Sequence, residues 1–567
     1  MEEDIRKRRQ SFEKKARELL GKLSLDEKMG LMSGTLTKRN VRNSILGRVK
    51  EHYNEAPYAA GGLPEKGIPP LLFVDGSRGV VCSTGKAVCF PVAALRAATF
   101  DPELEEKIGQ AIGEEVLAAG GNLFGGVCIN VPYHTGWGRC QETYGEDSFL
   151  IGEMGSALVR GITKTGVMAC IKHYAFGTME NVRLKVDVRC EKRAEREVYL
   201  APFEKCVEAG AAAVMTAYNQ YGGTYCGENA YLIREVLKGE WGFDGFVLND
   251  FTWGIHDTAR SVWAGLDVEM PTTHFYGDQL KSYLKERKVW EEHIEEAALR
   301  ILRTLLAHKS MEEAYKKRFP KETSQGPEKV FYNKIHISLA LTCAKKGITL
   351  LKNEGGLLPL RPGKIKSLVV LGPLAYEEHT GDHGSSQVYP PYVVSHMEAL
   401  LERTNGAQVT YYEGKNKRHC MRLASEADHV LIFAGSSPLD EGEYVKPDEE
   451  RVRPARYGGD RTLGISLKPE DLAIIEAVSE VRTDAIVILA GGGAFAIDGW
   501  DQKVGAILYE YYSGMEGANA LADILFGKEN PSGKLPYAFP QREEDLPPIG
   551  WENTRQTYQY LDRKSVV

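Results

Sequence analysis

The chain has 567 residues and a net charge of −7, with 43% hydrophobic and 26% charged residues. This composition argues against wholesale disorder, and the mildly acidic balance disfavours a nucleic-acid partner, which requires a basic footprint. At roughly 100–200 residues per domain, the length predicts two to four domains. Residues 1–20 are charged throughout and no apolar run reaches about 18 residues, so we expect a cytoplasmic protein with neither a secretory signal nor a membrane span.

The cysteines give no C-x-x-C spacing, and the histidines give no H-E-x-x-H metal motif. Ten cysteines lie between Cys82 and Cys420 without a C-x-x-C pair, and the thirteen histidines include no H-E-x-x-H motif. We therefore expect free thiols in a reducing compartment, with no metal and no cofactor in the reaction.

One sequence pattern recurs in the first part of the chain: a short apolar run is followed by polar residues. The runs are 69–74 before Asp75, 166–171 before Lys172 and His173, 211–217 before Tyr218, 243–248 before Asn249 and Asp250, and 264–266 before Asp267. Amphipathic stretches at 103–118, 193–209 and 229–238 predict helices between them. Alternating strands and helices predict a (β/α)8-type barrel over 1–310, with its chemistry at the carboxyl ends of the strands.

The second part predicts another α/β unit. Residues 311–363 are interpreted as a linker and a helix, and 364–567 as an α/β sandwich with an open sheet. Strand-then-glycine units lie at 367–373, 427–435 and 485–491, with a helix at 469–481. The triple glycine 491–493 lacks the spacing of a phosphate loop, so it is interpreted as a tight turn.

Carboxylates at the predicted barrel mouth are the strongest chemical signal. Asp250 is followed by Phe251 and Trp253, and a carboxylate beside aromatic rings is what a sugar site needs. Each such residue taken alone is equally consistent with a turn or helix cap. Together, the donors Arg139, Lys172 and His173 and the acceptor Asp75 suit a neutral polyhydroxylated substrate, and nearby cations would favour ionised Asp250.

Several segments carry a resemblance to a known family. They are 171–175 (I-K-H-Y-A), 214–219 (V-M-T-A-Y-N), 239–251 (G-E-W-G-F-D-G-F-V-L-N-D-F), 264–271 (A-G-L-D-V-E-M-P), 514–517 (G-M-E-G), 521–527 (L-A-D-I-L-F-G) and 530–536 (N-P-S-G-K-L-P). In this order they resemble the glycoside hydrolase family 3 β-glucosidases over about residues 20–545.

The resemblance implies a barrel followed by an α/β sandwich, with the active site where they meet. It implies that Asp250 is the nucleophile and that the terminal sugar is lined by Asp75, Arg139, Lys172, His173 and Tyr218. Phe251 stands where the family has tryptophan, so this part of the subsite wall is expected to differ.

The general acid/base of the family is a glutamate from the second domain, in an E-G-x-D-R or S-G-E-G-Y stretch. Here Tyr457 occupies the glutamate position before 458–461 (G-G-D-R), and the upstream segment 439–444 (L-D-E-G-E-Y) resembles a longer loop. We predict Glu441 as the acid/base, ahead of Glu443. A third alternative, that both are loop carboxylates and Glu449 or Glu450 acts instead, stays open. Desolvation in a cleft would raise the pKa of such an acid, and two carboxyl groups about 5–5.5 Å apart would give retention.

The expected function is a retaining exo-β-glycosidase that releases terminal non-reducing β-D-glucose by double displacement. The alternatives are a β-xylosidase, a bifunctional glucosidase/xylosidase and, from another class, a catalytically silent sugar-binding scaffold. The expected partner is a small β-glycoside or oligosaccharide, with no nucleic acid and no membrane; a homo-oligomer is possible. The N-acetylglucosaminidase branch is disfavoured because 172–177 (K-H-Y-A-F-G) lacks that branch's second histidine.

Overall fold

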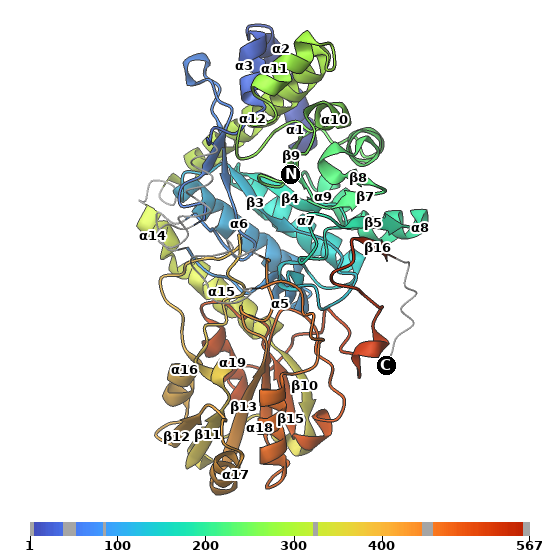
Figure 1. Cartoon of the computed structure of the whole chain (residues 1–567). Helices are drawn as coiled ribbons and strands as arrows, with labels where there is room; N and C mark the ends of the chain where they lie inside the picture. The colour runs from blue at the N-terminus through green and yellow to red at the C-terminus, as the bar shows by residue number, and fades with distance from the viewer. Residues whose placement is uncertain (1–4, 38–52, 83–86, 321–326, 445–457, 559–567) are drawn as a thin grey trace.

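The computed structural model describes residues 5–37, 53–82, 87–320, 327–444 and 458–558. Two α/β units are stacked end to end, the first running from blue to green and the second from yellow to red (Figure 1). Helix α15 (Lys334–Gly347) lies where they meet and packs against helices of both, α5 (Ala93–Ala98) and α19 (Gly517–Leu525).

The first unit is built on a six-stranded sheet. Its order is β1 (Tyr58–Ala60), β2 (Leu71–Val74), β3 (Leu123–Cys128), β4 (Met168–Tyr174), β6 (Ala213–Thr216) and β9 (Phe246–Asn249). Only the β1–β2 pair is antiparallel. Single bridges from Leu248 to Val268, from Ser33 to Glu269 and from Gly34 to Ala60 lead from β9 back to β1. The predicted barrel-type fold is thus confirmed, with one side closed by isolated bridges rather than full strands.

Helices surround this sheet. They are α1 (Ile5–Ser11), α2 (Glu13–Leu20), α3 (Leu25–Leu31), α5, α6 (Pro102–Ala118), α7 (Ser148–Lys164), α8 (Lys192–Ala194), α9 (Ala201–Glu208), α10 (Thr258–Ala264), α11 (Asp278–Lys285), α12 (Glu291–Arg318) and α14 (Pro327–Phe331). The start of α6 follows from its sequence, since Asp101 caps the backbone N–H of Leu104 and Pro102 needs no donor in the first turn.

Two predicted helices differ in form from the expectation. The stretch 193–209 is divided into α8, a π-type turn η3 (Glu195–Tyr199) and α9, and the stretch 229–238 corresponds to a π-type helix, η5 (Tyr231–Glu240). Pro202 accounts for the first difference, because a proline has no N–H to continue the hydrogen-bond ladder of a preceding helix.

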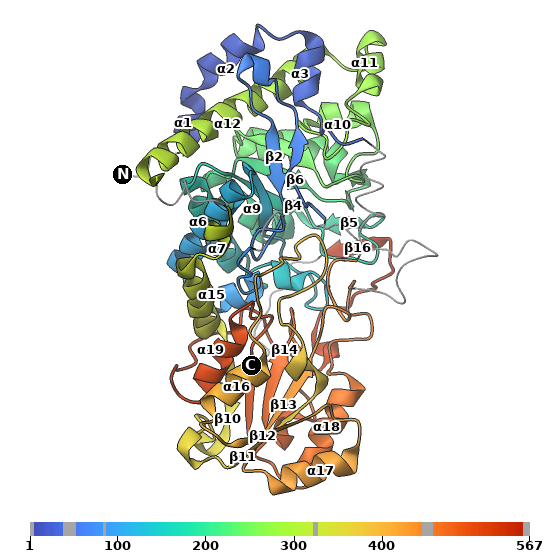
Figure 2. The ribbon, with the colours of Figure 1, turned by 90° about the vertical axis from the view of Figure 1, so that its left-hand side faces the viewer.

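The second unit is an open α/β sheet, as predicted. Its strand order is β10 (Thr349–Asn353), β15 (Ala506–Tyr509), β14 (Ile486–Ala490), β13 (His429–Gly435), β11 (Ser367–Leu371) and β12 (Gln408–Tyr412). All neighbours are parallel except β10 and β15. Helices α16 (His396–Arg403) and α19 lie on one side of the sheet, and α17 (Lys417–Glu426) and α18 (Pro469–Ser479) lie on the other (Figure 2).

Two segments cross the domain ranges expected from sequence. Strand β10 falls inside 311–363 but belongs to the second sheet. Near the other end of the chain, β16 (Arg555–Tyr558) pairs with β5 (Asp187–Cys190) of the first unit, in a four-stranded sheet completed by β7 (Gln220–Tyr221) and β8 (Thr224–Tyr225) (Figure 1). The chain therefore returns to the barrel unit after completing the sandwich.

Two further expectations concern helices and thiols. Within the described ranges, no helix combines the length and apolarity needed to cross a membrane. The ten cysteines, all within the described ranges, form no disulfide, and all except Cys190 are buried.

Candidate active site

The carboxyl edge of the barrel sheet brings several of the predicted residues together. Asp75 follows β2, Lys172 and His173 lie near the end of β4, and Asp250 follows β9. The Lys172 Nζ donates to Asp75 Oδ1 at 2.7 Å, and the His173 Nε2 lies 3.8 Å from Asp250 Oδ2. Parallel strands place their carboxyl ends at one edge, which is why residues far apart in sequence meet here.

Asp75 is held from several sides. Its Oδ2 accepts a hydrogen bond from the Tyr53 hydroxyl at 3.0 Å, and its backbone N–H donates to Asn54 Oδ1 at 2.6 Å. Burial alone would lower the pKa of Lys172, but the charge of Asp75 outweighs it and the pKa is raised. Lys172 is therefore a charged donor held in a fixed position on Asp75.

Arg139 is pinned by a carboxylate that sequence reasoning missed. Its Nε and Nη2 donate to the two carboxylate oxygens of Glu142 at 3.0 and 2.9 Å. Glu142 also accepts a hydrogen bond at 3.1 Å from the Ser386 hydroxyl of the second unit. This bidentate geometry orients the guanidinium firmly.

Of the aromatic residues that follow β6 and β9, Tyr218 and Phe251 are buried and Trp253 is exposed. The Tyr218 hydroxyl donates to the Phe251 carbonyl at 2.8 Å. The Phe251 ring points into the barrel, where it packs on Phe73 and Tyr58 with centroids 4.6 and 5.6 Å apart. Trp253, 46% exposed, lies edge-on to Tyr218 at 6.3 Å. The exposed aromatic surface beside Asp250 is therefore Trp253, and the wall role expected for Phe251 is not supported by its packing.

Glu441, the predicted acid/base, is enclosed in the second unit. Its residue exposure is 0%, and its Oε1 accepts hydrogen bonds from the Gly492 N–H at 2.6 Å and the Tyr512 hydroxyl at 2.8 Å. Burial raises the pKa of this carboxyl group, as expected for an acid. However, a carboxyl group with no exposed surface has no route to a substrate in this conformation.

Glu443, two residues later, lies on the other side of the loop and faces the barrel. Its Oε1 accepts from the Arg183 Nη1 at 2.9 Å, and its Oε2 accepts from the Ser385 N–H at 2.6 Å. Its side chain is 12% exposed, and its charge acts on both Asp250 and His173. The geometry thus reverses the expected preference for Glu441 over Glu443. The alternatives Glu449 and Glu450, together with Tyr457, lie outside the described residues.

Arg183 links the barrel to the Glu443 loop, and no sequence pattern indicated it. Its Nη1 donates to Glu180 Oε2 at 3.1 Å as well as to Glu443, and its Nη2 donates to the Tyr444 carbonyl at 3.1 Å. Its guanidinium carbon lies 5.2 Å from the centroid of the Tyr218 ring. A single cation therefore contacts both Glu443 and the tyrosine beside Asp250.

A second contact between the units fixes the base of the same loop. Asp460 accepts hydrogen bonds from the backbone N–H groups of Gly138, Glu180 and Asn181 at 3.1, 2.8 and 2.9 Å. Burial and the charge of Glu180 raise the pKa of Asp460 to about 7. Arg78 on the barrel also pairs with Asp382 at 3.0 Å, and Asp382 accepts the Glu443 N–H at 3.0 Å.

The electrostatics of the two carboxylates are opposite. Burial raises the pKa of Asp250 to about 6, although Arg183, Arg139 and Lys172 act to lower it. Burial also opposes ionisation of Glu443, but Arg183 and Arg139 hold its pKa well below the usual range. Burial, with help from Arg139 and Lys172, keeps the pKa of His173 well below its usual value, so this imidazole is neutral. The expected cationic effect on Asp250 is present, but burial exceeds it.

The raised pKa of Asp250 gives a stability prediction. The folded state holds the Asp250 proton more tightly than the unfolded chain does. Ionisation of Asp250 therefore does not lower the free energy of unfolding below about pH 3.8, and it lowers that free energy by its full amount above about pH 6. A shift of about 2 pKa units corresponds to about 3 kcal/mol. Asp250→Asn should therefore increase the free energy of unfolding by up to about 3 kcal/mol near neutral pH, and by progressively less as the pH falls toward 4.

Denaturant unfolding of Asp250→Asn at about pH 7.5 and about pH 4.5 measures this effect. Asp498→Asn, at an exposed loop aspartate, is the matched control and should show no such pH-dependent gain. A substitution at Asp250 that destabilises the chain equally at both pH values would contradict the inferred cost of its ionisation.

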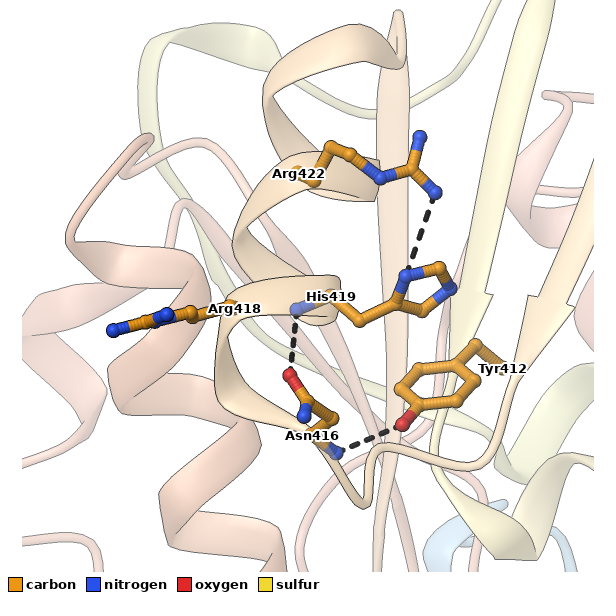
Figure 3. Close-up of a pocket in the computed structure, with 5 residues that line it drawn as sticks. All are labelled: Tyr412, Asn416, Arg418, His419 and Arg422. Atoms are coloured by element: carbon orange, nitrogen blue, oxygen red, sulfur yellow. Dashed lines mark hydrogen bonds between the residues drawn. The ribbon is translucent and has the colours of Figure 1, made fainter.

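A pocket lies far from this site, on the second unit. Figure 3 shows it lined by Tyr412, Asn416, Arg418, His419 and Arg422, from β12, α17 and the turn between them. The Asn416 N–H donates to the Tyr412 hydroxyl at 2.8 Å, and the Arg422 Nη2 lies 3.4 Å from the His419 Nδ1. No carboxylate lines it, so it offers no second site for carboxylate chemistry.

The chain matches known proteins over most of its length. The family model described as the Glycosyl hydrolase family 3 N terminal domain matches residues 36–304, and that described as the Glycosyl hydrolase family 3 C-terminal domain matches residues 348–565. Beta-glucosidase BoGH3A of Bacteroides ovatus is 31% identical over 89% of this chain and 71% of its own length. The chain belongs to glycosyl hydrolase family 3.

Two more similarities extend along most of the chain. Thermostable beta-glucosidase B of Acetivibrio thermocellus is 32% identical over 92% of this chain and 66% of its own length, so the chain spans about two thirds of that relative. The structure of beta-glucosidase 3B from Thermotoga neapolitana in complex with alpha-D-glucose has a TM-score of 0.81 and 27% identity, covering 96% of this chain and 79% of that one.

Proposed function

We propose that this chain is a retaining exo-β-glycosidase that releases terminal non-reducing β-D-glucose, with Asp250 as nucleophile and Glu443 as acid/base. The observation that carries the proposal is that two partly exposed carboxyl groups, one from each unit, both interact with the charge of Arg183. The side chains of Asp250 and Glu443 are 13% and 12% exposed. The beta-glucosidase names of the relatives support glucose as the sugar.

The proposed reaction is a double displacement. One Asp250 oxygen attacks the anomeric carbon while the Glu443 carboxyl group protonates the departing glycosidic oxygen. A glycosyl ester forms on Asp250 and the aglycone leaves with the proton. Glu443, now a carboxylate, removes a proton from water, and the hydroxide attacks the anomeric carbon and releases Asp250. Two inversions retain the β configuration.

The ion pairs around Asp250 provide hydrogen-bond partners for hydroxyl groups. Asp75 accepts from a sugar hydroxyl while Lys172 and Arg139 donate, and their mutual contacts hold all three in place before binding. His173, kept neutral, donates from one ring nitrogen without adding a charge that would oppose the positive charge developing on the sugar ring. Trp253 offers its exposed face to the aglycone.

The protonation of the pair has a measurable consequence. The reaction needs one proton on the two carboxyl groups, and this state exists between the low pKa of Glu443 and the pKa of about 6 for Asp250. In the free protein that proton resides on Asp250, and binding transfers it to Glu443 as the sugar displaces Arg183. We expect kcat/KM to decline above about pH 6.

A pH profile of the Glu443→Gln variant provides the control. With Glu443 removed, the reaction of an activated aryl glucoside needs only ionised Asp250, so kcat/KM should rise with pH below about 6 and then level off. Above about pH 6, kcat/KM should therefore decline for the wild-type protein and stay level for the variant. An unchanged declining limb in the variant would show that Glu443 does not carry the second ionisation.

A substrate panel tests the function itself. Aryl β-glucoside, β-xyloside, α-arabinoside and β-N-acetylglucosaminide are compared by kcat/KM, and the anomer released first from β-glucoside is followed by NMR. The expected result is a preference for β-glucoside with β-glucose as the first product. A preference for xyloside or arabinoside changes the sugar assigned, first release of α-glucose contradicts retention, and binding without turnover favours the silent scaffold.

We also propose a reducing, cytoplasmic location. The absence of a disulfide among the ten cysteines, all of which lie in the described ranges, supports it, because chains in oxidising compartments commonly form disulfides. Immunolocalisation in the source cells should place the chain in the cytoplasm; recovery from the culture medium would contradict this.

A further inference from the structure

A cluster of two histidines and a glutamate lies buried in the second unit, and the proposed reaction does not use it. His379 is on the loop after β11, His396 is the first residue of α16, and Glu510 directly follows β15. Their exposures are 4%, 3% and 0%. The cluster thus lies at the carboxyl ends of parallel strands of the second sheet.

The donor atoms of the three side chains converge. The His379 Nδ1 lies 2.9 Å from Glu510 Oε1, and the His396 Nε2 lies 2.9 Å from Glu510 Oε2. All three ligand atoms lie within 4.8 Å of one another. The His379 Nε2 is 2.8 Å from the Leu374 carbonyl oxygen. Because a carbonyl oxygen only accepts, Nε2 carries a proton, and Nδ1 is the nitrogen presented to Glu510.

One contact in the cluster is not a hydrogen bond. Neither the His379 Nδ1 nor the Glu510 Oε1 has a hydrogen-bond partner among the described residues, although the two buried atoms are 2.9 Å apart. Buried polar atoms left without a hydrogen bond are costly. A cation between the two atoms satisfies both.

A second buried histidine shows how this fold satisfies such a residue with protons alone. The His336 Nδ1 hydrogen-bonds Glu115 Oε1 at 2.9 Å, and its Nε2 hydrogen-bonds Glu114 Oε2 at 3.0 Å. Both ring nitrogens of His336 are therefore satisfied as donors. The cluster at Glu510 differs because its ring nitrogen and carboxylate oxygen face each other without that bond.

We propose that His379, His396 and Glu510 bind one divalent transition-metal ion of the Zn²⁺ type. Two imidazoles and a carboxylate suit this class of ion, and tetrahedral coordination places neighbouring donors about 3.3 Å apart. The observed separations of 2.9 Å need to open by only a few tenths of an ångström. The Leu374 carbonyl orients the His379 ring, as such groups commonly do around zinc. The Ser513 hydroxyl, 3.5 Å from Glu510 Oε2, or a water can supply the fourth ligand.

The site is structural rather than catalytic, and it does not depend on the proposed glycosidase activity. His379 lies three residues before Asp382, which pairs with Arg78 of the barrel and accepts the Glu443 N–H. A bound ion would therefore fasten the segment that supports the Glu443 loop. His379 and His383 do form an H-x-x-x-H spacing, but His396 and Glu510 lie 114 residues apart, so no short motif contains the cluster.

Metal titration of the full chain tests the proposal. The protein, with any affinity tag removed, is stripped with a chelator and dialysed. It is then titrated with Zn²⁺ against a chromogenic competitor and, separately, with Co²⁺ while visible absorbance is recorded. We expect one equivalent of tight Zn²⁺, a four-coordinate Co²⁺ spectrum and a Zn²⁺-dependent rise in Tm.

Three variants locate the ion. Glu510→Gln and His396→Gln should weaken Zn²⁺ binding by more than about 100-fold, since even outer-shell changes cost 10–100-fold. His336→Gln, at the other buried His–Glu cluster, should leave binding unchanged. Wild-type protein that binds no Zn²⁺ and gives no Co²⁺ spectrum overturns the proposal, whether or not the variants fold. Retention of tight binding by folded Glu510→Gln also overturns it.

Discussion

Asp250→Asn is expected to leave the fold intact and lower kcat for β-glucoside by about 10⁴-fold or more, the scale seen when a catalytic nucleophile is removed. The amide keeps the shape of the carboxyl group and can still contact the His173 ring nitrogen 3.8 Å away, but it cannot form the glycosyl ester. The variant should also be more stable than the wild-type chain near neutral pH, because it removes the cost of a buried ionisation. Loss of activity with gain of stability is the combined signature of a catalytic carboxylate.

The measurement is kcat with an aryl β-glucoside, together with urea unfolding of the same preparation. Asp267→Asn is an instructive comparison, because Asp267 also follows a predicted strand but pairs with Lys238 at 2.8 Å and accepts the Val247 N–H at 2.7 Å. Its substitution should destabilise the barrel and reduce kcat far less. Near-normal turnover by Asp250→Asn would remove the nucleophile assignment.

Glu443→Gln is expected to have the second-largest effect, about 10²–10⁴-fold on substrates with poor leaving groups, which is the range of general acid catalysis. Activated aryl glucosides need little protonation of the leaving oxygen, so their glycosylation should be slowed far less. Azide needs no general base and should attack the accumulated ester to give a β-glycosyl azide. Mass spectrometry of the products detects it.

Glu441→Gln is the matched variant, two residues away on the same loop. Because Glu441 bonds the Gly492 N–H and the Tyr512 hydroxyl inside the second unit, its substitution should lower stability and affect good and poor leaving groups alike. A β-glycosyl azide from Glu441→Gln, with none from Glu443→Gln, would restore the assignment made from sequence.

The two glutamates show where sequence reasoning ends. Glu441, Gly442 and Glu443 share one local pattern, and in a regular extended segment residues two apart point to the same side. Gly442, which pairs with Gly459 in a single antiparallel bridge, has a φ of 143° that breaks this alternation, and the two glutamates make contacts on different sides. Which side faces the barrel depends on contacts with Arg183 and Asp382, made across 260 and 61 residues of sequence. A one-dimensional pattern contains no such information.

Strands were predictable from short apolar runs and were missed where close packing requires glycine. The strand Phe246–Asn249 lies at the end of the predicted run 243–248, so it was located within a few residues. Strand β3 contains Gly125 and Gly126, and no strand was predicted there. A Cβ on Gly125 would lie 2.2 Å from the Phe73 ring, and one on Gly126 would lie 2.2 Å from the Gly76 carbonyl oxygen. These glycines are required by close packing inside the barrel rather than by a change of direction.

Some residues of the candidate site could be predicted from sequence and others could not. Residues at strand ends, such as Asp75 and Asp250, follow from the strand pattern, because parallel strands bring their carboxyl ends together. Tyr53 and Arg183 come from loops, and only the folded chain brings them to Asp75 and Glu443. The loop residues were therefore missed, although the charge of Arg183 acts to lower the pKa of both Asp250 and Glu443.

Trapping the covalent intermediate tests the central claim most directly. A β-glucosyl donor with fluorine at carbon 2 and an activated leaving group slows both steps of a double displacement, and hydrolysis of the ester suffers most. The intact protein should gain the mass of one fluoroglucosyl group, and peptide mapping should find it on Asp250. A label on Glu443, Glu441 or any other residue, or efficient turnover of a good substrate with no label at all, would contradict the account.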